Sequence, residues 1–560
     1  MTNKLTTPEF DKLNQDDIIL SEYPRPNFKR DSYICLNGYW DYKITKDIKD
    51  INSFNETIRV PYPIEAPAST VERTLKEDEY LIYHTKFKVD KSFIKDTTFI
   101  HFLGVDQGFK IILNGVEFEE IFPMYLPSKI DITKVLKEDN ELIVICKDTL
   151  DIIYPYGKQS KKPKGIFYTP VSGIYFPVFL ESVNNGYIED IKLTPTMESL
   201  SIEISSTSNE FEVEIFEGEE LIIKENIPSS KTFHFANPHL WDVDDPFLYK
   251  MIIKSENDKV ETYFALRQVE LKNGFVYLNN KKIFIAAVLD QGYYPEGLYT
   301  PSSYESYKRD ILTMKELGFN TLRKHIKIEL PYFYYLCDKL GMLVMQDFVN
   351  NGDYSFLRDT ALPTIGWIKR NDYFTHFNKK ARVNYIAHYT ALQKYLYNFP
   401  SIIAYTIFNE GWGQFKADYN YEIAKSNDPT RLCDSTSGWF QQKKSDFNSY
   451  HLYFKNINKL PKIKKKPVFI SEFGGFAYLE KEHLYSEDSF GYDTFESTDH
   501  LYNGLKALLE EKVLPYKNNV SGFVYTQLSD VETEVNGIVT YDRKVVKFKN
   551  EVKDLIDKFK

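Results

Sequence analysis

The chain changes character near residue 267, and this change limits its fold more than any other feature of the sequence. Before that point, short runs of alternating apolar and polar residues follow one another without a convincing helix, as in "YLIYHTKFKV" and "ELIVICKD". After it, helical and strand-like segments alternate over about 290 residues, the size of a (β/α)8 barrel. The sequence therefore predicts a multidomain protein of β plus α/β class, with β-sandwiches preceding a C-terminal TIM barrel.

The strand-only part divides into two units. Residues 33–180 carry regularly spaced strands separated by Gly, Asn, Asp and Pro, which is typical of a jelly-roll-like sandwich. The next stretch, up to residue 267, has about 80 residues with the strand spacing of an immunoglobulin-like sandwich. We therefore expect a jelly-roll domain at 1–184, an Ig-like domain at 185–267 and the barrel at 268–560.

Charge, apolar segments and cysteine usage indicate which partners and which compartment to expect. A formal net charge of −10 argues against nucleic acid and anionic membranes. The first residues, "MTNKLTTPEF", lack an apolar signal-peptide core, and no stretch reaches the roughly 18 apolar residues of a membrane span. Cys35, Cys146, Cys337 and Cys433 form no C-x-x-C pair, which predicts buried free thiols in a reducing compartment. These features together predict a cytoplasmic protein.

Polar side chains gather where the predicted barrel strands end. "SIIAYTIFNE" ends in Asn409 and Glu410, "PVFISEF" ends near Glu472, and "MLVMQDF" ends near Asp347. The strand "GFVYTQLSD" places Tyr525 near its end. Because the active sites of such barrels lie at the C-terminal ends of the strands, these residues are expected to share one rim.

Two carboxylates on separate strands suit cleavage of a glycosidic bond. One has to protonate the leaving oxygen, and the other has to attack the anomeric carbon or activate a water that does so. Glu410 and Glu472 are the candidates. A single Glu after an apolar run is more often a helix N-terminal carboxylate or a solvated loop residue. Longer motifs around each Glu are therefore needed to assign it a catalytic role.

Longer motifs resemble glycoside hydrolase family 2, which includes β-galactosidases, β-glucuronidases and β-mannosidases. "NFPSIIAYTIFNEGWG" resembles the acid/base motif of this family, and "PVFISEFGG" resembles its nucleophile motif. "LNGYWDYKI" and "GIFYTPVSGIYFPVFLE" are similar to its sugar-binding jelly roll, and "ANPHLWDVDDPFLY" is similar to its Ig-like domain. With "DVETEVNGIVTYDR" at the end of the barrel, the resemblance spans nearly the whole chain.

The resemblance implies roles for the matching residues. Glu410 would be the general acid/base, and Glu472 the nucleophile that forms a glycosyl-enzyme intermediate. Asn409 would donate a hydrogen bond to the sugar 2-hydroxyl. Arg323, in "NTLRKH", would lie beside the nucleophile and keep it ionised, with a structural ion pair as an equal alternative.

The segment "FNSYHLYF" supplies further substrate-binding candidates. Tyr453 would hydrogen-bond and orient the nucleophile, with Tyr450 as the fallback. His451 lies between them and is a candidate for the same pocket. Trp412 and Trp439 are candidates for stacking on the apolar face of a sugar, with core packing as the alternative, and we favour the pocket for Trp412. Tyr525 is a weaker candidate.

Two departures from the family pattern fall at the ends of the first two barrel strands. Asp290, in "AAVLDQGYYPEGLY", replaces an Arg-His-Glu-His-like segment, and it either binds sugar hydroxyls or forms the turn before Gly292. Alternation along the second strand puts His325 on the same face as Arg323, which makes it a pocket candidate. For the neighbouring Lys324 and Lys327, the alternative to a role in the site is that they are solvated.

A third departure concerns sugar specificity. β-Glucuronidases carry an Asn-x-Lys pair before a Gly-Ile-Phe/Val-Thr segment, and its cation binds the sugar carboxylate. Here Glu534 and Asn536 stand before "GIVT", so the lysine is missing and a carboxylate replaces the asparagine. A Glu facing a uronate would repel it, which argues against glucuronides unless Lys324 or Lys327 supplies the charge.

The sequence therefore predicts a retaining exo-β-glycosidase, with a neutral sugar such as galactose as the default. β-Glucuronidase or another family 2 activity with a non-standard pocket is one alternative, and an inactive carbohydrate-binding protein is another. A metal-dependent hydrolase fits poorly, because there is no H-E-x-x-H segment and the ten histidines do not cluster at ligand spacing. We expect a carbohydrate or glycoconjugate substrate, no cofactor or metal, and, from the resemblance, a homo-oligomer.

Overall fold

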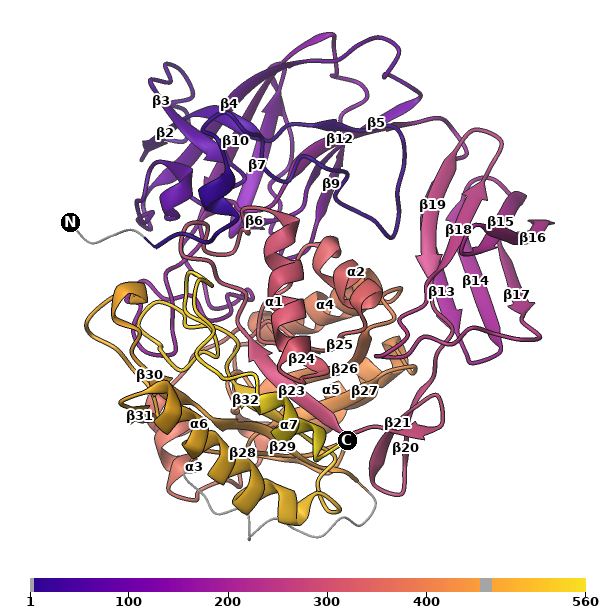
Figure 1. The fold of residues 1–560 in the computed structure, drawn as a ribbon. Coiled ribbons are helices and arrows are strands. Elements are labelled where there is room, and N and C mark those ends of the chain that lie inside the picture. Colours follow the sequence, from indigo (N-terminus) through magenta and orange to yellow (C-terminus); the bar gives the residue numbers. More distant parts are fainter. Residues whose placement is uncertain (1–4, 454–465) are drawn as a thin grey trace.

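The computed structural model describes residues 5–453 and 466–560, and its elements form two β-sandwiches followed by a barrel (Figure 1). This is the predicted order of fold classes. Cys146, Cys337 and Cys433 are buried free thiols, as predicted, whereas Cys35 is only half-buried. No helix in the described part of the chain is long and apolar enough to cross a bilayer.

Two antiparallel sheets make the N-terminal sandwich. Strand alternation buries one face of each sheet, and Trp40, Tyr83 and Val144 lie in the shared core. Tyr83 pairs with Val144 on one side and with Tyr42 on the other. The first sheet has the order β1 (Ile34–Cys35), β12 (Val178–Val183), β5 (Thr97–Phe102), β9 (Ser128–Asp131). The second has the order β3 (Glu56–Val60), β2 (Gly38–Thr45), β4 (Tyr80–Lys88), β10 (Asp139–Lys147), β7 (Gly108–Leu113), β8 (Val116–Glu117).

The Ig-like sandwich also consists of two antiparallel sheets around its own apolar core. One has the order β13 (Ile188–Pro195), β14 (Ser199–Ser206), β17 (Ser230–His234). The other has the order β16 (Glu220–Ile227), β15 (Phe211–Glu217), β18 (Tyr249–Lys254), β19 (Lys259–Phe264). Trp241 packs in a cluster with barrel-strand residues and donates to the carbonyl of Asp338, so it joins this domain to the barrel.

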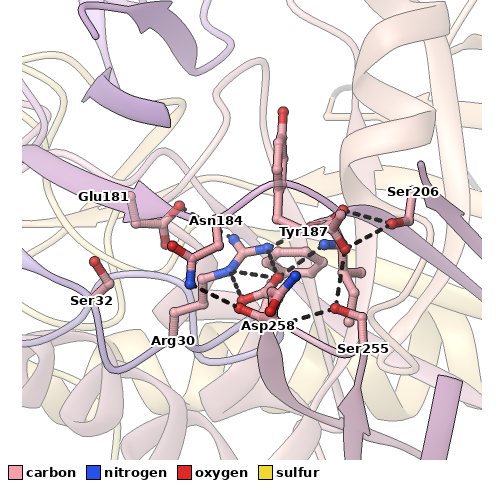
Figure 2. Close-up of polar contacts among 12 residues, drawn as sticks. Arg30, Ser32, Glu181, Asn184, Tyr187, Ser206, Ser255 and Asp258 are labelled. Carbon is pink, nitrogen blue, oxygen red and sulfur yellow. Dashed lines mark hydrogen bonds and ion pairs between the residues drawn. The ribbon is translucent and has the colours of Figure 1, made fainter. Parts of the chain in front are cut away.

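A buried arginine joins the two sandwiches. Arg30 donates to both carboxylate oxygens of Asp258, in the turn before the last strand of the Ig-like domain, with its Nη2 2.8 Å from Oδ2 (Figure 2). Its other terminal nitrogen lies 3.4 Å from Glu181 of β12. Because a buried bidentate pair has a defined geometry, Arg30 fixes the orientation of one sandwich against the other.

The barrel is an eight-stranded parallel sheet that is nearly closed, with its edge strands β27 and β28 side by side. Helices surround the strands (Figure 1). The strand order is β27 (Leu432–Ser437), β26 (Ile402–Asn409), β25 (Leu343–Asp347), β24 (Thr321–Lys324), β23 (Ile285–Asp290), β32 (Gly522–Thr526), β29 (Val468–Gly474), β28 (Asn448–Leu452). The helices are α1 (Tyr304–Glu316), α2 (Pro331–Leu340), α3 (Leu362–Thr364), α4 (Lys379–Leu396), α5 (Ala417–Asn427), α6 (Thr498–Ala507), α7 (Val552–Asp557).

Local sequence explains where the first two helices begin and end. The hydroxyl of Ser303 accepts the backbone N–H of Glu305 and caps α1, while Pro331 occupies the first turn of α2. Gly318 and Gly341 follow these helices with φ of +93° and +70°. A Cβ at residue 341 would lie 2.2 Å from the carbonyl oxygen of Val243, so only glycine fits this turn.

Candidate active site

Strand geometry brings the two predicted carboxylates to one rim. Glu410 follows the last residue of β26, and Glu472 lies near the end of β29. His451 of β28 stands beside Glu472 in the parallel register. One carboxylate oxygen of Glu410, one of Glu472 and one ring nitrogen of His451 all lie within 4.8 Å of one another. The two acidic groups therefore face the same small volume.

Glu472 is surrounded by donors. Arg323 donates to Oε1 over 3.1 Å and the Tyr453 hydroxyl donates to Oε2 over 2.7 Å, as the predicted roles of these residues require. The residue is 4% exposed. Burial by itself raises the pKa of this carboxyl, but the positive charges of His451 and Arg323 and the Tyr453 hydrogen bond hold the pKa well below its usual range. Glu472 is therefore an anion at neutral pH.

Arg323 connects three groups at the rim. It is 1% exposed, and its Nε donates to Asp347 Oδ1 over 3.0 Å. Burial lowers the pKa of this guanidinium, but Asp347 and Glu472 raise it above its usual value. Its Nη2 donates to Asn409 Oδ1 over 2.9 Å. Because the amide oxygen of Asn409 is engaged, its amide nitrogen remains as the donor for a ligand, and no partner for that nitrogen is seen among residues 5–453 and 466–560.

Glu410 has a different environment from Glu472. Its backbone adopts a left-handed φ of +54°, and its side chain is 14% exposed against 6% for Glu472. His451 Nδ1 lies 3.0 Å from Oε1 of Glu410, and His451 Nε2 lies 3.1 Å from the hydroxyl of Ser437. The indole N–H of Trp439 donates to the backbone carbonyl of Glu410 over 2.9 Å. Glu410 thus has one ionic contact and access to solvent.

His325 reaches the same site through Asp347. Its Nδ1 lies 2.6 Å from Asp347 Oδ2, so His325 and Arg323 meet on opposite oxygens of one carboxylate. Burial lowers the pKa of this imidazole, and Asp347 acts in the opposite direction. Because Asp347 accepts from Nδ1, the neutral ring presents Nε2 as an acceptor. The expectation that His325 shares the face of Arg323 agrees with this contact.

Asp290 belongs to a buried ionic cluster. Its Oδ2 lies 2.7 Å from Lys324 Nζ and its Oδ1 accepts the N–H of Gly292, which is the turn contact that we weighed as the alternative. Lys324 and Lys327 each lie 2.8 Å from Glu329 Oε1 and are 1% exposed. The alternative that these lysines are solvated is wrong, because Glu329 and Asp290 neutralise them inside the protein. A role for Asp290 in sugar binding stays a prediction.

The aromatic candidates separate into two groups. Trp412, for which we favoured the pocket, is 3% exposed and packs edge-on against Tyr156, Phe167 and Tyr354. Tyr525 is 1% exposed among other aromatic rings. Neither leaves a free ring face for a ligand. Trp439 lies edge-on to His451 at 5.3 Å and bonds to Glu410, so it borders the site.

Several contacts at the site were not predicted. Tyr492 stacks on Tyr453 with ring centroids 4.0 Å apart, and the Thr526 hydroxyl lies 2.8 Å from that of Tyr453. Tyr168 of the N-terminal sandwich donates to Glu534 over 2.5 Å. Tyr492 and Tyr168 lie on loops between strands, where no periodicity marks them. Thr526 ends β32, so strand-end inspection could have found it.

Three sequence profiles match the chain. "Glycosyl hydrolase 2 galactose-binding domain-like" covers residues 64–172, "Glycosyl hydrolases family 2" covers 182–267, and "Glycosyl hydrolases family 2, TIM barrel domain" covers 269–560. The chain is 26% identical over 404 residues to a β-galactosidase of Vibrio vulnificus, spanning 66% of this chain and 37% of that protein. It is 27% identical over 350 residues to a β-galactosidase of Thermoanaerobacter pseudethanolicus, spanning 56% and 46%. The match thus spans less than half the length of each of these relatives.

Solved structures share the fold over nearly the whole chain. A β-D-glucuronidase of Dictyoglomus thermophilum superposes with a TM-score of 0.78 at 16% identity, covering 96% of this chain and 98% of that one. A β-galacturonidase of Eisenbergiella tayi gives 0.71 at 19% identity, with the same coverage. At such identities these likenesses show the three-part architecture alone.

Proposed function

Because the chain belongs to glycosyl hydrolase family 2, we propose that it is a retaining exo-β-glycosidase in which Glu472 and Glu410 carry out the two displacements. One observation carries this proposal: carboxylate oxygens of the two residues lie within 4.8 Å of each other. Retaining enzymes hold their carboxyl groups about 5–5.5 Å apart, whereas inverting enzymes leave about 6.5–9.5 Å for a water. The short separation supports double displacement.

In the first step, a carboxylate oxygen of Glu472 attacks the anomeric carbon and the bond from that carbon to the leaving oxygen breaks. Glu410 gives its proton to that oxygen. Asn409 donates to the sugar 2-hydroxyl, a contact that strengthens as positive charge grows on the ring. The anionic state of Glu472, held by Arg323 and Tyr453, supports its part in this step.

In the second step, Glu410 takes a proton from water, and the hydroxide oxygen bonds to the anomeric carbon as the ester bond to Glu472 breaks. The partial solvent access of Glu410 suits a group that exchanges protons twice in each cycle. The sugar leaves with the configuration that it had in the substrate. An inactive carbohydrate-binding protein is disfavoured because Glu410, Glu472 and Asn409 are all present and in contact with His451 or Arg323.

In this proposal the enzyme removes a terminal sugar from its substrate. Tyr168 of the N-terminal sandwich donates to Glu534 near the nucleophile, and this cover from a second domain supports an exo mode of action. The relatives in Vibrio and Thermoanaerobacter are named β-galactosidases, so a galactose-configured sugar is the first candidate.

A panel of 4-nitrophenyl β-glycosides tests the proposed activity. Purified protein should release 4-nitrophenol from at least one of the β-galactoside, β-galacturonide, β-glucuronide, β-glucoside and β-mannoside. Glu410, His451 and Glu472 are the one group of described side chains that could hold a metal ion, so each assay is repeated after EDTA treatment. We expect unchanged rates, because Arg323 already supplies the cation beside Glu472. Loss of activity with EDTA, restored by a divalent cation, would favour a metal-dependent hydrolase.

A further inference from the structure

Lys158 is a buried lysine at the mouth of the barrel, and no carboxylate of the described residues forms an ion pair with it. It lies on the loop 148–172 of the N-terminal sandwich and is 7% exposed. Within the described part of the chain, no carboxylate oxygen comes within 4.0 Å of its ammonium nitrogen. Arg323, Lys324 and Lys327, the buried cations at the ends of β24 and its loop, all have such partners.

The backbone on both sides of Lys158 is fixed against the barrel. The N–H groups of Tyr156 and Gly157 donate to the carbonyl of Asn350, which follows β25. A Cβ at residue 157 would lie 3.0 Å from the carbonyl oxygen of Ile326, so glycine allows the close approach. On the other side, Gln159 Nε2 donates to Asp106 and Tyr125 over 2.6 Å each. The loop therefore holds the backbone of Lys158 at a defined position against the barrel.

The charge of Lys158 acts on two barrel groups that flank the site. Burial lowers the pKa of His325, and the charge of Lys158 lowers it further. Burial raises the pKa of Glu534, and here the charge of Lys158 acts in the opposite direction. Glu472 lies close enough to Glu534 to raise that pKa as well. Lys158 is thus close enough to both His325 and Glu534 for its charge to act on each of them.

Glu534 does not face the site as a bare anion. The residue is 2% exposed, its Oε2 accepts from the Tyr168 hydroxyl over 2.5 Å, and its Oε1 accepts from Asn536 over 3.0 Å. Both carboxylate oxygens are therefore engaged, and burial favours the protonated form. Burial thus weakens the repulsion that the sequence suggested between Glu534 and a uronate, whereas the hydrogen bonds from Tyr168 and Asn536 favour the anion.

We propose that Lys158 binds the carboxylate of a terminal hexuronic acid, so that the substrate of this site is a β-hexuronide rather than a neutral glycoside. This inference rests on the proposed exo-β-glycosidase activity. Lys324 and Lys327 cannot serve in its place, because Asp290 and Glu329 already neutralise them. A buried positive charge that forms no ion pair with the described residues is complementary to one negative group on the ligand.

Matched pairs of substrates test this assignment. Wild type, Lys158→Met, Lys158→Arg and the control Lys162→Met, which changes an exposed lysine of the same loop, are assayed on 4-nitrophenyl β-D-galacturonide and β-D-galactoside, and on the β-D-glucuronide and β-D-glucoside. We expect wild type to prefer one uronide over its neutral counterpart. Lys158→Met should lower kcat/KM for that uronide by about 100-fold and for the neutral sugar by less than about 5-fold. Lys158→Arg should recover part of the loss, and the control should match wild type.

Two results would overturn the assignment. One is a wild type that cleaves only neutral glycosides, and the other is a Lys158→Met variant whose kcat/KM falls equally for uronides and neutral glycosides. Titration calorimetry with free galacturonate and glucuronate separates this proposal from the catalytic one. If no glycoside is cleaved but wild type binds one of these acids and Lys158→Met does not, the carboxylate site stands and the proposed function fails. If glycosides are cleaved and neither acid binds, the proposed function stands and the carboxylate site fails.

Discussion

Replacement of Glu472 by glycine is expected to lower kcat for the preferred aryl β-glycoside by about 10⁴-fold or more, because the covalent step loses its nucleophile. The backbone of β29 and the neighbours Arg323 and Tyr453 should remain in place, since glycine removes atoms and adds none. The melting temperature of the variant reports whether the fold persists. The control Glu482→Gly, at an exposed glutamate, should keep the wild-type rate.

Sodium azide should restore part of the lost turnover. The deleted side chain leaves a space beside Arg323 that a small anion can enter, and azide can attack the anomeric carbon from the side that Glu472 used. The product would be the α-glycosyl azide, because no second displacement follows. Glu472→Gln, which keeps the volume filled, should show no rescue. A folded Glu472→Gly variant that azide and formate both fail to rescue would exclude Glu472 as the nucleophile.

Glu410→Ala is expected to show a loss that depends on the leaving group. For a 4-methoxyphenyl glycoside, whose oxygen needs a proton to leave, formation of the intermediate should slow by about 10³-fold. For a 2,4-dinitrophenyl glycoside, which leaves as an anion, the same step should slow by less than about 10-fold, and azide should accelerate release of the sugar.

Pre-steady-state release of the phenol measures this step directly. Glu422→Ala, at an exposed glutamate of α5, is the matched control. Equal losses for both leaving groups would assign Glu410 to binding rather than to proton transfer. His451 contacts Glu410 through Nδ1, so His451→Asn should shift the pH profile of the first step while leaving its leaving-group dependence intact.

Much of this architecture could be predicted because local sequence patterns mark its strands and helix ends. Period-two alternation marks the sandwich strands, and a glycine after each apolar helix marks where α1 and α2 end. Strand ends in a parallel barrel share one rim, so residues such as Asn409 and Glu472 could be expected to meet without knowledge of the loops. The contact of Arg323 with both of them follows from the same rule.

Features that depend on loops could not be predicted. Trp412 follows a strand end like Glu410, yet three rings from two other loops cover it. Lys324 and Lys327 look like surface lysines in the sequence, but Glu329 on the same loop folds back and neutralises both. Lys158 is distant in sequence from every barrel strand, and only the docking of its loop on Asn350 brings it to the site. Contacts between residues distant in sequence determine the environment of each of these side chains, and no rule based on residue spacing predicts such contacts.

The stereochemistry of the first product tests the central claim most directly. Hydrolysis of the preferred aryl β-glycoside is followed by proton NMR in the first minutes, before the free sugar equilibrates between anomers. Attack by Glu472 and then by a water that Glu410 activates predicts that the β-anomer of the sugar appears first. Initial release of the α-anomer would mean a single displacement, and would contradict the roles given to both glutamates.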